Sequence, residues 1–472
     1  MIKWFWFFGI IFIILLIMAS SRAFKKNRSI DDYMLAGSNI GAILGVLTYA
    51  AALFSAFIFI GVPDFFRVHG VGAWIFLPVS DGIMFFMIFW FGYNLRKKAR
   101  STGYKGMAGM MRDIFGNKWA GYLVFTGAFL FLIPYVAIQI RGMSMFFTAI
   151  FPEMLPSWGW ALIIVAIMLA YSELGGLKAI VFSDAVQGVL LLTVLSIIGY
   201  NCVIHFGNVE ELFDQVQQAD DRLLSTPGPK GLFTTQFLIA SFLAIMLLPI
   251  SQPQFSSRIV VMKSMKETYK MAGGVSIVAF IVFVATAFIG MYGAVKYPES
   301  STVEFVQNAL LFDQPDFLAG LAIVGLFAAV LSTSNAQIFA LGSEFRSLLR
   351  GEDKSVLIRT KIALFIFALI VMAFSVIISD ELVLLARVSF AGTSMLAPVI
   401  LVGVISKRPP GKELLIISAI ALFVFLFSVF QLIPENIMGV RLDLGMYVIL
   451  FVVTVISIVA RGTLKKVPDE HI

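Results

Sequence analysis

Residues 325–338 read Gly-Leu-Phe-Ala-Ala-Val-Leu-Ser-Thr-Ser-Asn-Ala-Gln-Ile, an apolar segment in which small and hydroxyl-bearing residues replace bulky aliphatic ones. Ser332 and Thr333 are adjacent, and Ala329 lies about one helical turn before them. On one helix, the two hydroxyls and the Ala329 carbonyl would supply three oxygens of a five-oxygen cage suited to Na⁺, and a second backbone would supply the others. The alternative is that the hydroxyls bond to carbonyls four residues earlier or allow helices to pack closely.

The composition around this segment requires a membrane. Hydrophobic residues make up 60% of the 472 positions and charged residues 13%, so a water-soluble fold could not bury the apolar surface. The net charge of +7 comes from basic residues in short loops, which indicates the lipid bilayer and not nucleic acid as the partner. With one cysteine and three scattered histidines, the sequence offers no disulfide, zinc motif or catalytic residues, so we expect no enzyme.

The apolar runs predict an all-α polytopic membrane protein, and the first run is read as a retained helix because its basic residues follow it. We predict about 13 transmembrane helices, an estimate from apolar run length, near 3–21, 39–63, 73–95, 119–149, 158–172, 179–205, 233–255, 273–296, 317–344, 361–379, 382–405, 413–431 and 443–460. Most of the 35 lysines and arginines fall on one side of this topology, in 22–28, 96–118, 258–270, 346–361, 407–412 and 461–466. This bias predicts the N-terminus outside and the C-terminus inside, in the inner (cytoplasmic) membrane.

An odd number of spans leaves room for two five-helix units of opposite orientation. We predict one transmembrane transporter domain over 1–472, with inverted repeats at 39–205 and 233–405. The helix at 3–21 and the two helices within 413–460 are then peripheral. A bundle without repeats remains the alternative, since the two halves share no obvious residue identity.

The second span, residues 48–63, offers the oxygens that the cage lacks. It contains a stretch of small residues near mid-membrane, and a break there would expose backbone carbonyls. No glycine or proline lies between Thr48 and Ala56, so an intact helix is the local expectation.

Four motifs resemble the sodium:solute symporter family. They are the small-x-x-x-Ser pattern followed by Phe-Ile-Gly in the second span, Tyr171-Ser-Glu-Leu-Gly-Gly-Leu-Lys-Ala179 leading to Ser183-Asp-Ala-Val-Gln187, the Gln252-Pro253 pair, and Ala329-Val-Leu-Ser-Thr333. The resemblance implies a LeuT-type 5+5 inverted repeat with alternating access. It also implies a Na⁺ site made by the carbonyls of Ala51, Phe54 and Ala329 and the hydroxyls of Ser332 and Thr333.

Some members of that family are similar in having a second sodium site, which here would use Asp184, Ser332 and hydroxyls one turn farther along the span at 317–344. This chain departs from the pattern with Asn335 and Ala336 where serines are expected. Asp184 and Asn335 are therefore candidates for a second ion site or for the ion's exit path. The alternative for Asp184 is an exposed N-cap of its helix.

The solute is less well defined. Proline carriers of the family have an aspartate, a tryptophan and a tyrosine where this chain has Leu53, Ile245 and Pro249, so a proline-like or sugar-like pocket is poorly supported. Candidate solute-binding residues are the polar ones in or near the spans: Ser55, Asp81, Gln139, Ser251, Gln252 and Gln254. Arg141 or Arg387 could hold a carboxylate, which would suit a small monocarboxylate or an amino acid. The alternative is that each arginine pairs internally, for example with Asp81, or reaches water at the interface.

These features predict a secondary active transporter that couples inward Na⁺ movement to uptake of a small organic solute. A transporter-like membrane sensor and a Na⁺ channel without a coupled solute are the alternatives. The chain ends soon after the last span, which leaves no room for a kinase domain and disfavours the sensor. Solute-dependent Na⁺ uptake separates all three, because a sensor shows no flux and a channel needs no solute.

Overall fold

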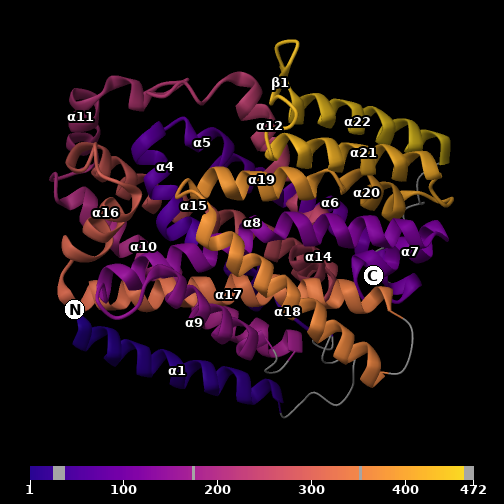
Figure 1. Ribbon diagram of the computed structural model, residues 1–472, viewed down its shortest axis with the longest axis horizontal. Coiled ribbons are helices and arrows are strands. Elements are labelled where there is room, and N and C mark those ends of the chain that lie inside the picture. Colours follow the sequence, from indigo (N-terminus) through magenta and orange to yellow (C-terminus); the bar gives the residue numbers. More distant parts are fainter. Residues whose placement is uncertain (25–37, 173–175, 350–352, 462–472) are drawn as a thin grey trace.

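Helices account for nearly all of the protein in a computed structural model, which describes residues 1–24, 38–172, 176–349 and 353–461 (Figure 1). The longer continuous helices are α1 (Ile2–Phe24), α6 (Pro78–Thr102), α8 (Lys118–Ile150), α9 (Ser157–Ser172), α10 (Gly176–Ile204), α15 (Met265–Lys296), α17 (Asp316–Leu348), α18 (Asp353–Ile377), α21 (Lys412–Val429) and α22 (Leu442–Arg461). Three helices are interrupted: α3 (Ala42–Leu53) with η2 (Phe57–Gly61) and α4 (Val62–His69), α12 (Thr235–Met246) with α13 (Leu248–Ser251) and α14 (Pro253–Val260), and α19 (Leu382–Ser394) with α20 (Ala397–Ile405). Short elements connect them: α5 (Ala73–Phe76), α7 (Met107–Phe115), α11 (Val209–Ala219), η3 (Asp221–Leu224), α16 (Thr302–Gln307), η4 (Asn308–Phe312) and the hairpin β1 (Asn436–Ile437) with β2 (Val440–Arg441).

The lengths of these helices suit a bilayer. Within the described residues, nine helices are long and apolar enough to cross a membrane, and two bent pairs raise this number to 11. Two shorter apolar helices, Ser157–Tyr171 and Thr235–Met246, coincide with the predicted spans at 158–172 and 233–255. The all-α polytopic fold is confirmed, and the count of thirteen spans stays a prediction.

Side-chain capping fixes where several helices begin. Ser264 precedes α15, and its hydroxyl accepts a hydrogen bond from the backbone N–H of Glu267 at 3.3 Å. Ser301 does the same for Glu304 at the start of α16, at 3.2 Å. The Ser-x-x-Glu spacing in both places satisfies backbone donors that the first helical turn would leave unpaired.

Two helices are interrupted at mid-length in the same way. α3 ends at Leu53, and Phe54 is extended, with φ −96° and ψ 121°. α13 ends at Ser251, and Gln252 is also extended, with φ −101° and ψ 125°. Pro253 accounts for the second break, because a proline disfavours helical backbone in the residue before it.

No proline or glycine accounts for the first break, and the expectation of an intact helix over 48–56 is wrong. The chain bends by 65° between the segments Ala42–Leu53 and Phe57–His69. The contacts that replace the lost helical hydrogen bonds come from another helix and are described below.

Helix α1 and the pair α21 and α22 lie at opposite edges of the bundle (Figure 1). One large hydrophobic core joins most of the buried side chains. Part of the α1 interface forms a small separate cluster of Phe12 and Leu16 with Val324 and Ala328 of α17. α1 packs along α17 and α10, and most of its side chains face outward.

Candidate sodium and solute site

The break after α3 is held open by two side chains of α8. The Tyr135 hydroxyl donates to the carbonyl of Leu53 at 2.8 Å. The Gln139 Oε1 accepts from the N–H of Ala56 at 3.0 Å, and its Nε2 donates to the Ser55 hydroxyl at 3.1 Å. All of these groups are buried, so without α8 the broken backbone would carry unsatisfied polar groups in an apolar interior.

Opposite this break, α17 brings its paired hydroxyls to the end of α3. The Ser332 Oγ lies 3.0 Å from the Ala51 carbonyl oxygen and 3.0 Å from that of Ala329. The Thr333 Oγ1 lies 2.9 Å from the Ala51 oxygen and 3.2 Å from the Phe54 oxygen. Tertiary packing therefore brings the five predicted oxygens together from two helices about 280 residues apart in the sequence, with the Ala51 carbonyl oxygen close to both hydroxyls.

Asp184 lies inside α10 and is fully buried, so its interpretation as an exposed N-cap is wrong. Its Oδ2 accepts from the Arg258 Nη2 at 2.7 Å and from the Thr48 hydroxyl at 2.6 Å. The Arg258 Nε also donates to the carbonyl oxygen of Thr48 at 3.0 Å. This buried ion pair joins α10, α14 and α3 one turn away from Ala51.

Arg258 lies in a helix and not in a loop, so its predicted place in the basic loop at 258–270 is wrong. α14 continues to Val260, and Arg258 is 1% exposed. A carboxylate within a span needs a cation nearby, so Asp184 was itself a signal that one of the neighbouring basic residues had to be buried.

Polar side chains also gather at the second break. The Gln252 Nε2 donates to the Thr393 hydroxyl of α19 at 3.2 Å, and the Gln254 Nε2 donates to the Gln252 Oε1 at 2.6 Å. Ser251 donates back to the carbonyl of Leu247 at 3.0 Å within its own helix. Gln252 and Gln254 are thus connected across helices, whereas Ser251 serves its local turn.

The two candidate arginines pair internally. The Arg141 Nε donates to an Asp380 oxygen at 2.9 Å. Arg387 forms an ion pair with Asp443 and donates to the Ser241 hydroxyl at 2.5 Å. The suggested partner Asp81 was wrong for both, since Arg141 pairs with Asp380 and Arg387 pairs with Asp443.

Two predicted features remain without a described partner. Asn335 is 2% exposed on α17, and among the described residues its Oδ1 accepts no hydrogen bond and none joins it to Asp184. The middle of the motif at 171–179, residues 173–175, lies outside the residues that the structure describes.

Tyr135 is the site residue that sequence reasoning missed most clearly. Tyr135 and Gln139 are four residues apart, so both lie on one face of α8. Two polar groups at that spacing within an apolar helix were a signal that the face meets unpaired backbone.

The chain is similar to known sodium-coupled transporters in sequence. A model of the sodium:solute symporter family matches residues 33–412. The chain is 23% identical to the high-affinity proline transporter PutP of Bacillus subtilis over 406 residues, covering 82% of this chain and 84% of that protein. It is also 23% identical to the sodium/pantothenate symporter of Haemophilus influenzae, covering 68% and 66% of the two chains.

The fold has a solved counterpart. A Na⁺-coupled sialic acid symporter in a substrate-bound, outward-open state superposes with a TM-score of 0.76 at 14% sequence identity, covering 98% of both chains. Broken first helices, a hydroxyl pair facing the first break, a LeuT-type fold and a family match over most of the length converge on one identity. The chain belongs to the sodium:solute symporter family and is a multi-pass inner-membrane symporter, not an enzyme, that couples Na⁺ to uptake of a small organic solute.

Proposed function

We propose that Na⁺ binds between the carbonyl oxygens of Ala51, Phe54 and Ala329 and the hydroxyls of Ser332 and Thr333. The observation that supports this proposal is that the site has fewer hydrogen-bond donors than acceptors. Each hydroxyl has a single hydrogen but lies within hydrogen-bond distance of two carbonyl oxygens. Several lone pairs therefore converge without donors, in a buried place where a hard cation such as Na⁺ is the natural complement.

In this proposal, Na⁺ couples the broken helix to α17. Bound Na⁺ draws the end of α3 toward α17 and stabilises the outward-open state. The units at 39–205 and 233–405 act as the inverted repeats, and rocking of one bundle opens the inner path. Each positive charge that moves inward across 100 mV contributes about 2.3 kcal/mol, which is sufficient to concentrate a solute with one ion.

We assign Asp184 to the exit path and not to a second resident ion. Its Oδ2 already accepts from Arg258 and Thr48, so its charge is compensated without another cation. Asn335 and Ala336 offer fewer hydroxyl ligands than two serines would. A departing Na⁺ would meet a carboxylate whose Oδ1 has no hydrogen-bond partner among the described residues.

The solute is proposed to lie between the two breaks. Ser55 and Gln139 border the first break, and Gln252 and Thr393 border the second. Aromatic rings stand beside them: Phe57 lies 6.2 Å from Phe390, centroid to centroid, and Tyr135 lies 5.0 Å from it. An apolar wall with amide and hydroxyl groups suits a small monocarboxylate or amino acid with an apolar body.

The arginines do not support the carboxylate part of this proposal, because both are occupied by aspartates. Recognition would rest instead on amides, on hydroxyls and on the bound Na⁺. A carboxylate group would be favoured beside the cation and beside the N-terminal end of a broken helix.

The test is uptake into proteoliposomes with a panel of monocarboxylates and amino acids, with an inward Na⁺ gradient or with K⁺ in its place. We expect one solute class to accumulate only with Na⁺ and to stimulate Na⁺ entry. Uptake of a solute that lacks a carboxylate, with none of the panel transported, would refute the substrate class while leaving the sodium site standing. Solute-independent Na⁺ flux would refute coupling itself.

A further inference from the structure

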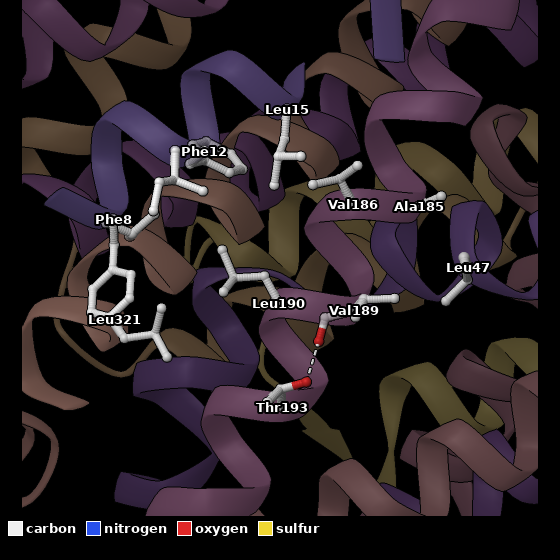
Figure 2. Close-up of a pocket in the computed structure, with 12 residues that line it drawn as sticks. Phe8, Phe12, Leu15, Leu47, Ala185, Val186, Val189, Leu190, Thr193 and Leu321 are labelled. Carbon is white, nitrogen blue, oxygen red and sulfur yellow. Dashed lines mark hydrogen bonds between the residues drawn. The ribbon is translucent and has the colours of Figure 1, made fainter. Parts of the chain in front are cut away.

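An apolar groove of about 520 Å³ lies between α1, α10 and α17 (Figure 2), and several of its lining side chains, such as Ile11, Leu15 and Val189, are exposed on the apolar surface. Its walls are Phe8, Ile11, Phe12 and Leu15 of α1, Leu321 and Val324 of α17, Leu47 of α3, and Ala185, Val186, Val189, Leu190 and Thr193 of α10. The single polar side chain, Thr193, donates its hydroxyl to the Val189 carbonyl at 2.8 Å, so the groove offers no free hydrogen-bonding group (Figure 2). A volume of this size is typical of small-molecule sites.

The groove borders the surface on which α1 packs against α17 and α10. Near its outer end, α1 packs closely against α17, since a Cβ placed on Gly320 would lie 2.6 Å from the Cβ of Trp4. Farther along, Phe12 and Leu16 meet α17 in their own small cluster. Beside this cluster, α1 and α10 leave a gap that protein atoms do not fill, and in a bilayer only hydrocarbon can fill it.

The charge at one end of the groove indicates the kind of lipid. Lys178 lies seven residues before Ala185 on α10, which is about two turns or 10 Å along the same helix face. It is half-buried and forms no ion pair with a described residue. With the orientation that the loop charges predict, Lys178 faces the cytoplasmic leaflet, where an anionic phosphate would lie.

We infer that the groove holds one acyl chain of an anionic inner-leaflet phospholipid, whose phosphate lies over Lys178. The chain completes the packing of α1 against α10 and α17. The groove also lies next to the buried ion pair, because its lining residues Leu47 and Ala185 are the sequence neighbours of Thr48 and Asp184. α3 and α10 are in close contact there: a Cβ on Gly188 would lie 3.2 Å from the Leu47 carbonyl oxygen.

The experiment uses the full chain in phosphatidylcholine vesicles that contain a small fraction of phosphatidylglycerol with a photoreactive diazirine at mid-chain. After illumination, adducts are mapped by peptide mass spectrometry. We expect them to concentrate on residues 8–15 and 185–193. Uniform labelling of all lipid-facing helices would overturn the inference.

Ala185→Phe tests the chain site because the added ring fills the groove. We expect it to lower labelling of 185–193 severalfold. The matched control is Ala166→Phe, on the exposed face of α9, which should leave labelling unchanged. If Ala185→Phe does not fold, Val189→Phe replaces it, since Val189 is 52% exposed and its change disturbs no core. Undiminished labelling in a folded groove variant would overturn the proposal.

Lys178→Ala tests the head group. We expect labelling by the phosphatidylglycerol probe to fall by about fivefold, the effect of one basic residue near an anionic lipid, and labelling by a phosphatidylcholine probe to stay the same. Equal labelling by both probes in the unmodified protein would contradict the anionic assignment. None of these measurements depends on Na⁺ binding, so they stand apart from the proposed sodium site.

Discussion

Replacing both Ser332 and Thr333 by alanine removes two of the five oxygens proposed to bind Na⁺. A hydrogen-bonding group that faces a charge contributes about 1.5–3 kcal/mol, and about 1.4 kcal/mol changes a binding constant tenfold. Each single variant should therefore weaken Na⁺ binding by about tenfold or more, by the same estimate. Both hydroxyls share the Ala51 carbonyl, so the two effects will not simply add. We expect the Na⁺ concentration for half-maximal uptake to rise by about 100-fold or more in the double variant.

The same change can be measured without knowing the solute. Na⁺ that binds only the folded protein raises its stability by RT ln(1 + [Na⁺]/Kd), or about 1.4 kcal/mol at ten times Kd. Thermal unfolding of purified protein in Na⁺ against K⁺ at equal ionic strength should show a rise in Tm for the wild type and none for the double variant at the same concentration.

The controls separate ion binding from helix packing. Ser334→Ala removes a neighbouring buried hydroxyl that has no hydrogen-bond partner among the described residues, and it should leave the Na⁺ dependence unchanged. Thr333→Ser keeps the hydroxyl and should retain most of the Na⁺ response. An unchanged Na⁺ requirement in a well-folded double variant would refute the assignment of these oxygens.

Three further changes test the surrounding contacts. Gln139→Leu leaves the Ala56 N–H unsatisfied and should destabilise the protein by about 1–3 kcal/mol while slowing uptake; wild-type thermal stability would contradict the role of Gln139 at the break. Asp184→Asn leaves Arg258 buried without its counter-charge and should cost about 3–5 kcal/mol, whereas replacing both by neutral residues should recover part of the loss; a double variant worse than the single one, in denaturation assays, would contradict this. Arg141→Ala breaks a partly exposed pair and should change stability by about 1 kcal/mol or less and leave the solute KM unchanged; a large rise in KM would return Arg141 to the solute site.

The hydroxyls proposed to bind Na⁺ could be singled out from local sequence, because they form an adjacent pair within one apolar helix. A Ser-Thr pair in an apolar helix also fits back-bonding to carbonyls or close helix packing, and it was the family resemblance that named the carbonyls on the other helix. The backbone at Phe54 was not predictable from its own neighbours. Its extended conformation is stabilised by Tyr135 and Gln139, about 80 residues away, so no local rule for glycine or proline could find the break.

Arg258 shows where prediction from loop charges fails. Counting loop charges gives an orientation, but it treats every basic residue near a span boundary as a topology signal. Arg258 stands near such a boundary and is nevertheless buried, because the carboxylate of Asp184 lies within 2.7 Å. Boundary residues can be assigned only when the charge that each buried group requires has been found.

The neutral pairing of Asp184 and Arg258 leads to a distinction between the two proposed solute classes. The buried aspartate is already paired with Arg258, and the proposal therefore has a single Na⁺ bound by five oxygens that carry no formal charge and one Na⁺ carried with each solute. An amino acid zwitterion carried with one Na⁺ moves one net charge, so an inside-negative potential of 100 mV should add about 2.3 kcal/mol to its accumulation. A monocarboxylate anion carried with one Na⁺ moves none, and its accumulation should not respond to the potential. Uptake of an anion that rises steeply when a K⁺ diffusion potential is imposed would require a second coupled cation, and Asp184→Asn would then test whether Asp184 binds it.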